Sequence, residues 1–182
     1  MDDRRLKEYA FKIYKGESGY SLQKAFRLFP KYYPKIAFFY TKLLTNQQNE
    51  FSLRTIQSLG IDKGRTLLNE LNILNERISK FYVKAEFKLN QAYKRIEDAK
   101  YEYDRRNVVK EEQLVMWRIA DQTNEFAKEA NILLSKILDE AKIYNFENVK
   151  YDIKNAKKMS KLIFIDLDYL NIRYLNYIQQ YK

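Results

Sequence analysis

Apolar residues recur at helical spacing through most of this chain, and the clearest series begins at Leu67. It alternates steps of four and three residues through Leu67, Leu71, Leu74, Ile78, Phe81 and Ala85. Such steps are typical of a heptad seam on one side of a long helix. The series continues less regularly through Leu89, Ala92, Ile96 and Ala99. The pattern therefore predicts a long helix that starts after Asp62, a residue suited to an N-cap.

Three shorter helices are predicted near the start of the chain. A first helix over 4–14 would bury Leu6, Tyr9, Ala10 and Ile13. Ser21 can cap a second helix over 22–29, because its hydroxyl can accept a hydrogen bond from a free backbone N–H group. Pro34 suits the first turn of a third helix that ends near Leu44.

The polarity of residues 45–50 predicts a connector, and a short fourth helix is expected from Ser52 to Leu59. Gly60 then ends that helix. Small helices joined by tight turns are therefore expected first, and long helices afterwards. We interpret residues 1–75 as a helical head and residues 76–182 as long amphipathic helices that form a bundle or coiled coil.

Two more amphipathic stretches are expected after residue 100. One contains Trp117, Ala120, Ala127, Ala130, Leu134, Ile137 and Ala141. The other contains Val149, Ile153, Ala156, Ile163, Leu167 and Leu170. Bends are expected near residues 105–107 and between Asn145 and Asn148. The whole chain has only four Gly and two Pro, too few for the turns of a sheet-rich fold, so the prediction is an all-α fold.

The net positive charge lies in one half of the chain. Residues 1–95 carry 19 Lys and Arg against 9 Asp and Glu, whereas residues 96–182 carry 15 of each kind. A basic half joined to a neutral half indicates that one part meets a polyanion and the other meets protein. The neutral half is therefore the candidate for self-association as a homodimer or higher homo-oligomer, with an intramolecular helical core as the alternative.

Catalytic and metal-binding residues are scarce. The chain has no Cys and no His, which removes thiolate and imidazole metal ligands and the commonest general base. Five carboxylates lie among basic residues at helical spacing, as ion-pair partners do: Glu111, Glu112, Asp121, Glu125 and Glu129. The apolar run 162–168 ends in Asp-x-Asp, but only 14 residues follow it, too few for a phosphatase sheet of the haloacid dehalogenase type. We expect no enzymatic activity and no cofactor.

The sharpest local pattern is residues 52–74, SLRTIQSLGIDKGRTLLNELNIL. A short amphipathic helix ends at Leu59-Gly60-Ile61, and a second helix restarts with Leu67, Leu71 and Leu74 inward. The segment resembles the helix-turn-helix of DNA-binding regulators. The resemblance implies that Gly60 is left-handed, that the two helices meet at a steep angle and that the second enters the major groove. An ordinary αα-corner is the alternative.

The second helix of this pattern carries polar residues opposite its Leu residues. Arg65, Asn69 and Asn72 share that outer face, and Lys63 and Thr66 lie in the first turn. Arg and Asn side chains bind guanine and adenine edges bidentately. These five residues are therefore the candidate DNA-binding set, and a solvated helix face is the alternative.

A basic stripe runs farther along the same helix. Its members recur at steps of three, four, four and seven residues and are Arg77, Lys80, Lys84, Lys88 and Arg95. A stripe of this length can follow phosphates, with each contact releasing a counterion. The alternative is the wet surface of a coiled coil. Arg54 is a further candidate phosphate contact.

Basic and aromatic residues also interleave in the Pro-framed segment 26–35. Its candidate phosphate contacts are Lys31, Tyr32, Tyr33 and Lys35. Aromatic rings can stack on bases, and Tyr hydroxyls can bind phosphates. In the alternative, Tyr32 and Tyr33 cover the core. The three Phe residues of this region, Phe26, Phe29 and Phe38, are expected to be core residues.

These features favour a protein that binds duplex DNA, either as a transcriptional regulator or in plasmid or viral DNA maintenance. Two alternatives fit the same charge distribution: a helical coat-type nucleoprotein that does not read sequence, and a helical adaptor for an acidic protein or anionic membrane surface. The longest apolar run, 36–40, is far below the ~20 residues of a membrane-spanning helix. No signal peptide is visible. A cytoplasmic location is expected, or a virion for the coat-type alternative.

Overall fold

The computed structural model describes residues 2–99 and 105–141. This part of the chain forms helices and no strand, so the predicted all-α fold is confirmed. Its helices are α1 (Asp3–Tyr14), α2 (Leu22–Leu28), α3 (Tyr33–Ser58), α4 (Gly60–Asp98) and α5 (Arg105–Ala141).

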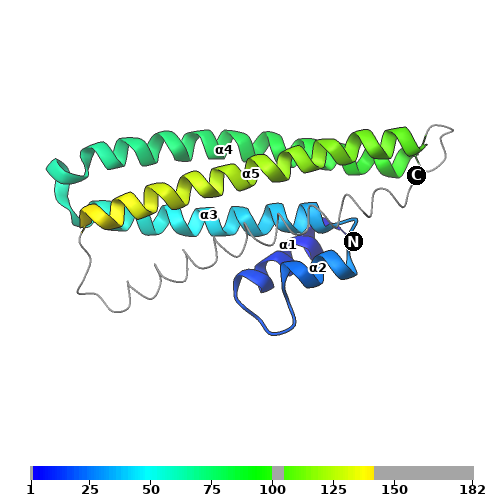
Figure 1. The fold of residues 1–182 in the computed structure, drawn as a ribbon, viewed down its shortest axis with the longest axis horizontal. Coiled ribbons are helices and arrows are strands. Elements are labelled where there is room, and N and C mark those ends of the chain that lie inside the picture. Colours follow the sequence, from blue (N-terminus) through cyan, green and yellow to red (C-terminus); the bar gives the residue numbers. More distant parts are fainter. Residues whose placement is uncertain (1, 100–104, 142–182) are drawn as a thin grey trace.

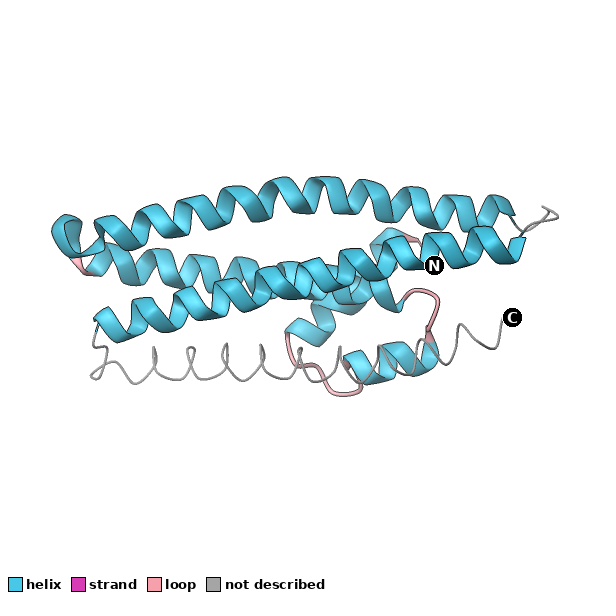
Figure 2. Cartoon of the chain, turned by 45° about the horizontal axis from the view of Figure 1, so that its top comes forward, coloured by secondary structure: helices cyan, strands magenta, loops and turns pink. Residues whose placement is uncertain are grey.

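Three long helices form an elongated bundle. In Figure 1, α3, α4 and α5 lie side by side, and α4 runs antiparallel to the other two. The short helices α1 and α2 pack against the first part of α3, and α4 and α5 extend beyond them. Figure 2 shows how little of the described chain is loop, since the turns between helices are short. The caps that hold α1 and α2 are Asp2, whose side chain accepts from the Arg5 N–H group, and the predicted Ser21.

The heptad seam predicted for the long helix is confirmed in α4. Its buried members are Leu67, Leu71, Leu74, Ile78, Ala85, Leu89, Ala92 and Ala99, while Phe81 and Ile96 are half-buried. In α5 the buried residues include the predicted Ala120, Ala127, Ala130, Leu134 and Ile137. The division between head and bundle that the sequence suggested at residue 75 falls in the middle of α4, which continues without interruption to Asp98.

The third helix is longer than predicted. It runs through to Ser58, so the expected connector at 45–50 and the separate short helix from Ser52 are wrong. From Thr41 onward its buried residues are mostly polar, since Leu44 and Ile56 are accompanied by Thr41, Thr45, Gln48, Ser52 and Thr55. The hydroxyls of Thr41, Thr45 and Thr55 donate to carbonyl oxygens four residues earlier, at 2.8, 2.8 and 3.0 Å. Because α3 satisfies its own buried hydroxyls, polar residues can form a seam that hydrophobic periodicity does not reveal.

Aromatic packing joins α3 to α4. Phe26 and Phe38 are buried as predicted, and the Phe38 ring lies edge-on to that of Tyr82 with 5.5 Å between centroids. The Tyr82 hydroxyl donates to Thr45 Oγ1 at 3.1 Å. Burial raises the pKa of Tyr82 to about 12, so this hydroxyl keeps its proton and remains a donor even in alkaline solution near its ordinary pKa. The contact fixes which side of α4 faces inward.

A very short turn leads from α3 into α4. Gly60 has φ +80°, the left-handed backbone that the sequence predicted. Leu59 occupies the N-cap of α4, so Asp62 lies in the first turn and is not the cap that we predicted. A Cβ on Gly64 would lie 3.0 Å from both Cγ2 and the carbonyl oxygen of Ile56. Gly64 therefore lets the start of α4 lie directly against the end of α3.

The angle between these two helices differs from the steep crossing that we expected. Gly64 faces Ile56 beside the turn, and Tyr82 reaches Thr45 farther away from it. Contacts at increasing distance from the turn on both helices require an antiparallel pair, which Figure 1 also shows. The physical reason is the length of α3, because a buried seam that continues back from the turn keeps the two helices aligned.

Gly60→Ala is expected to destabilise the fold by about 1–2 kcal/mol, the cost of a left-handed backbone for a residue with a Cβ. Nothing lies within 4 Å of a Cβ at Gly60, so the loss would come from the backbone and not from a clash. Chemical denaturation measures the difference. Gly60→Asn is the control and should lose less, since Asn tolerates this conformation better. An Ala variant as stable as the wild type would contradict the positive φ.

Candidate nucleic-acid interface

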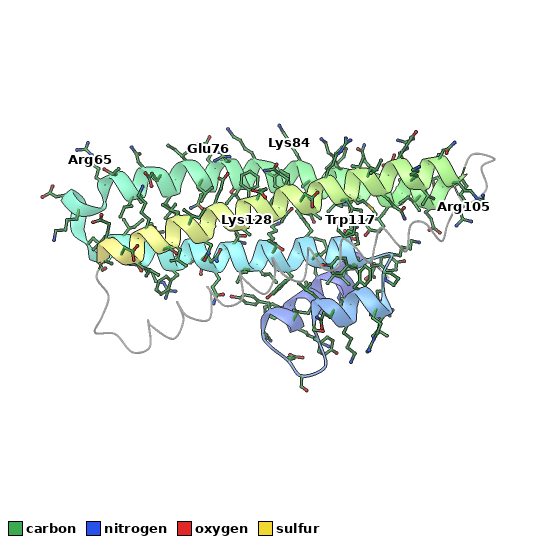
Figure 3. All side chains as sticks on the ribbon, in the orientation of Figure 1. Arg65, Glu76, Lys84, Arg105, Trp117 and Lys128 are labelled. Carbon is green, nitrogen blue, oxygen red and sulfur yellow. The ribbon has the colours of Figure 1, made fainter. Side chains whose placement is uncertain are left out.

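The predicted DNA-binding residues lie on the exposed side of α4. This helix buries its seam against α3 and α5, so the opposite side faces solvent. Figure 3 shows Arg65 pointing outward near the α3–α4 turn and Lys84 pointing outward farther along. All five predicted residues are exposed there: Lys63, Arg65, Thr66, Asn69 and Asn72. We call this surface the outer face of α4, and its second part adds Ile73, Glu76, Lys80, Val83, Lys84, Phe87, Lys88 and Lys94.

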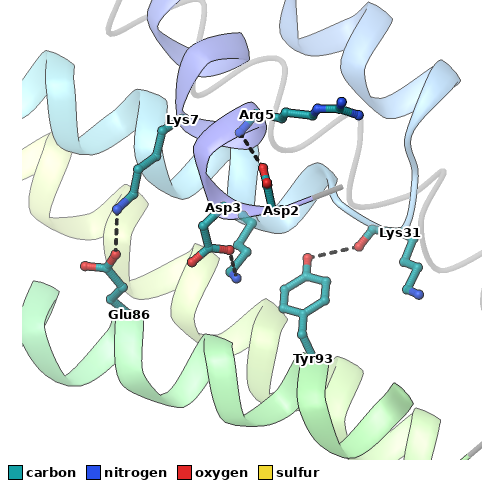
Figure 4. A network of polar contacts seen from close by, with 8 residues as sticks. Asp2, Asp3, Arg5, Lys7, Lys31, Glu86 and Tyr93 are labelled. Carbon is teal, nitrogen blue, oxygen red and sulfur yellow. Dashed lines mark hydrogen bonds and ion pairs between the residues drawn. The ribbon is translucent and has the colours of Figure 1, made fainter.

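Acidic residues at the edges of α4 bind lysines of other elements. Glu70 pairs with Lys136 of α5 at 3.1 Å. Glu86 pairs with Lys7 of α1 at 3.2 Å, as Figure 4 shows, and with Lys42 of α3 at 3.9 Å. These carboxylates therefore hold helices together and do not neutralise the outer face.

A further carboxylate, Glu97, pairs with Lys31 at 3.3 Å. With these acidic residues engaged elsewhere, Lys84, Lys88 and Lys94 are exposed and form no ion pair within the described part of the chain. Lys80 differs, because Glu76 lies one turn away and pairs with it at 3.0 Å. Three lysines of this stretch thus carry positive charge that no described ion pair neutralises, and the exposed carboxylate of Asp98 follows Lys94 by one helical turn.

Two of the predicted phosphate contacts are buried, and their prediction is wrong. Tyr33 is 0% exposed and packs edge-on against Phe26, with 5.3 Å between ring centroids. Lys35 is 5% exposed and its ammonium forms an ion pair with Asp3 of α1. The same ammonium lies 4.9 Å from the centroid of the Tyr93 ring. The pair with Asp3 joins the start of α3 to α1, and the contacts with Phe26 and Tyr93 join it to α2 and α4.

The rest of the Pro-framed segment is attached to α4. The Tyr93 hydroxyl donates to the Lys31 carbonyl oxygen at 2.9 Å, as Figure 4 shows. Tyr32 is half-buried and stacks on the Tyr93 ring, with 6.1 Å between centroids. The Lys31 ammonium is the one paired with Glu97. This segment therefore works as a joint between the α2–α3 turn and α4, and the basic-aromatic pattern has a structural explanation.

The predicted basic stripe is divided between two environments. Arg77 pairs with Glu129 of α5 at 3.0 Å, and its guanidinium lies over the Phe126 ring. Arg95 pairs with Glu112 of α5. Both Arg residues serve the α4–α5 contact, so the stripe does not offer them as free phosphate contacts. Arg54 is exposed near the end of α3.

The expectation that the α5 carboxylates form ion pairs is confirmed for Glu112, Glu125 and Glu129. Lys94 was not among the predicted contacts, although it lies two heptads after Lys80 and therefore on nearly the same side of the helix. The exposed apolar residues Val83 and Phe87 were not predicted either, and they interrupt the polar surface opposite the seam. The positions of these residues relative to the heptad seam of α4 could have revealed them in the sequence.

Comparison of the chain with protein-family models, with curated proteins and with solved structures gives no significant match. None of the described helices is both long and apolar enough to cross a bilayer. In residues 2–99 and 105–141, no three His, Cys, Asp or Glu gather as metal ligands would. The predicted helix through Val149 and Leu170 and the Asp-x-Asp run lie outside the described residues. Self-association through the neutral half stays a prediction.

Proposed function

We propose that this protein binds nucleic acid, with duplex DNA as its ligand, along the outer face of α4. The observation that supports the proposal is the separation of charge on this helix. Glu70, Glu86 and Glu97 pair with lysines of other elements, while Lys84, Lys88 and Lys94 face solvent without a described partner. Unpaired cations on one helix release counterions when they meet phosphates, and this release drives binding.

The dimensions of α4 suit such a contact. Its 39 residues span about 58 Å at 1.5 Å per residue, longer than one turn of B-DNA. Lys84 and Lys94 are separated by about 15 Å along the helix axis. A rigid helix within a bundle holds the backbone of these lysines in place before the ligand arrives, so binding costs conformational entropy in their side chains alone.

Arg65, Asn69 and Asn72 are the base-reading residues in this proposal. They lie at the other end of the same outer face, exposed and close to the α3–α4 turn. Their side chains have the donors and acceptors that recognise guanine and adenine in the major groove. Sequence-specific binding by this part of α4, as in a regulator, rests on these exposed side chains, because α3 and α4 form an antiparallel pair without the steep crossing of a helix-turn-helix.

A second candidate function is a coat-type nucleoprotein that binds without reading sequence. The antiparallel packing of α3 and α4 favours it, because α4 meets its ligand with its side and not with its N-terminal end. A helix presented in this way follows a phosphate backbone more readily than it enters a groove, which is about 12 Å wide. The two candidates share the outer face of α4 and differ in specificity.

Arg65→Ala and Asn69→Ala are each expected to weaken specific DNA binding by about 1–3 kcal/mol while leaving the melting temperature unchanged. Duplexes enriched by the protein from a random pool provide the ligand, and gel shifts at two salt concentrations give the affinities. A regulator prefers the enriched duplex by ~10³-fold or more over random DNA, whereas a coat-type protein shows little preference.

The matched controls are Arg27→Ala on α2 and Asn46→Ala on α3, both exposed and outside α4. They should leave the affinity unchanged. If Arg65→Ala and Asn69→Ala melt the fold instead, these side chains are structural and the assignment of the base-reading residues is wrong. If the wild-type protein binds no nucleic acid at low salt, the proposed function itself is wrong.

A further inference from the structure

Two large apolar side chains lie exposed in the middle of the outer face of α4. Val83 is 73% exposed and Phe87 is 63% exposed, and they are separated by one helical turn. Both lie opposite the buried seam, so they contribute nothing to the packing of the bundle. An aromatic ring that is held in water by a rigid helix is available to a ligand.

The surroundings of this pair are cationic. Lys84 and Lys88 each follow one of the two apolar residues directly, and Lys80 and Lys94 lie about one and two turns away. Between Arg77 and Ile96 the only acidic residue of α4 is Glu86. Its carboxylate is engaged by Lys7 and Lys42 at the inner edge of the helix. The occupant of this surface must therefore offer both negative charge and an apolar or aromatic contact.

This combination selects among possible occupants. A second copy of the same face would bring two rows of lysines together, and like charges oppose such a contact. Duplex DNA offers phosphates, but its base faces are stacked inside the helix and are reached only by unstacking them. Single-stranded nucleic acid offers both features at once, because its phosphates lie next to bases whose faces are free.

We propose that the outer face of α4 binds single-stranded nucleic acid, with a base stacked on the Phe87 ring and the neighbouring phosphates on Lys84 and Lys88. This inference rests on the proposed function and names a second form of ligand for the same face. Aromatic stacking tolerates any base, so binding at this position is not sequence-specific. Val83 extends the apolar contact by one helical turn.

The test compares a 20-nucleotide single strand of mixed sequence with the same sequence as a duplex. Phe87→Ala should weaken binding of the single strand by about tenfold and change duplex binding by less than twofold. Phe87→Leu keeps an apolar side chain but removes the ring, and it should lose nearly as much. Phe87→Trp should restore the affinity, and its added fluorescence over the wild type should be quenched by the single strand.

The matched control is Ile132→Ala, because Ile132 is an apolar residue of α5 that is 68% exposed and lies off the outer face of α4. It should leave both affinities unchanged. An unchanged single-strand affinity in Phe87→Ala overturns the inference, and unaltered duplex binding beside it leaves the proposed function in place. Binding to neither form overturns both.

Two other outcomes would assign Phe87 to a different class of partner. In the first, Phe87→Ala abolishes self-association in sedimentation experiments and leaves the single-strand affinity intact, which makes the patch a protein contact. In the second, the variant loses binding to vesicles that contain phosphatidylserine and again keeps the single-strand affinity, which makes it a membrane contact. Either result overturns the assignment to nucleic acid.

Discussion

Changing Lys84, Lys88 and Lys94 together to Gln is expected to lower the affinity for duplex DNA by about two to three orders of magnitude near 0.1 M salt. Each lost phosphate contact removes about 0.9 from the slope of log affinity against log salt concentration, so the slope should fall by about 2.7. The three lysines are exposed and take part in none of the described ion pairs, so the fold should not change. Gel shifts over a salt series measure the slope, and circular dichroism checks the helices.

A charge-matched control separates the outer face of α4 from the overall charge of the protein. Arg5, Lys15 and Arg27 are exposed on or beside α1 and α2, and their triple change to Gln removes the same charge elsewhere. This control should keep most of the affinity and nearly the original salt slope. If it loses as much as the α4 variant, DNA responds to net charge alone and the outer face has no special role.

Phe38→Ala is expected to reduce the free energy of unfolding by about 3–5 kcal/mol, which is a large part of the stability of a domain of this size. Phe38 is 1% exposed and contacts both Tyr82 of α4 and Phe39 of its own helix. Its removal leaves a cavity at the contact between α3 and α4, in a region where α3 cannot move without disturbing its other neighbours. Denaturation by urea, followed by circular dichroism, measures the loss.

Phe87→Ala is the internal comparison for this measurement, because it removes the same side chain from the exposed side of α4. It should change stability by no more than about 0.5 kcal/mol. A similar loss in both variants would contradict the orientation of α4 in the bundle. If Phe38→Ala reduces the free energy of unfolding by much less than expected, the core relaxes around the cavity.

Much of the fold follows from local signals in the sequence. The seam of α4 is predicted by the spacing of Leu67, Leu71 and Leu74, and the start of α2 by the side chain of Ser21. The length of α3 is not predicted by local signals, because Gln48 and Ser52 are buried polar residues whose role depends on neighbouring helices. A polar run inside a bundle has the same composition as a polar connector, and only tertiary contacts distinguish the two.

In the candidate site, too, some features follow from the sequence and others depend on tertiary contacts. The exposure of Arg65, Asn69 and Asn72 follows from their position opposite the seam, and the structure agrees with that position. The burial of Lys35 does not follow from its neighbours, since its partner Asp3 lies 32 residues away in the sequence. Similarly, the pairing of Arg77 depends on α5. A charged residue at a helix edge is assigned to solvent or to a partner only once that partner is known.

The separation of tasks on α4 also bears on how this sequence can change over evolutionary time. Positions such as Leu71 are constrained by the bundle, and substitutions there endanger folding. The bundle does not constrain Lys84, Lys88 and Lys94 in this way, so these positions should vary freely unless selection for ligand binding preserves them. If diverged descendants of this protein keep these lysines, the lysines have been selected for contact with a ligand.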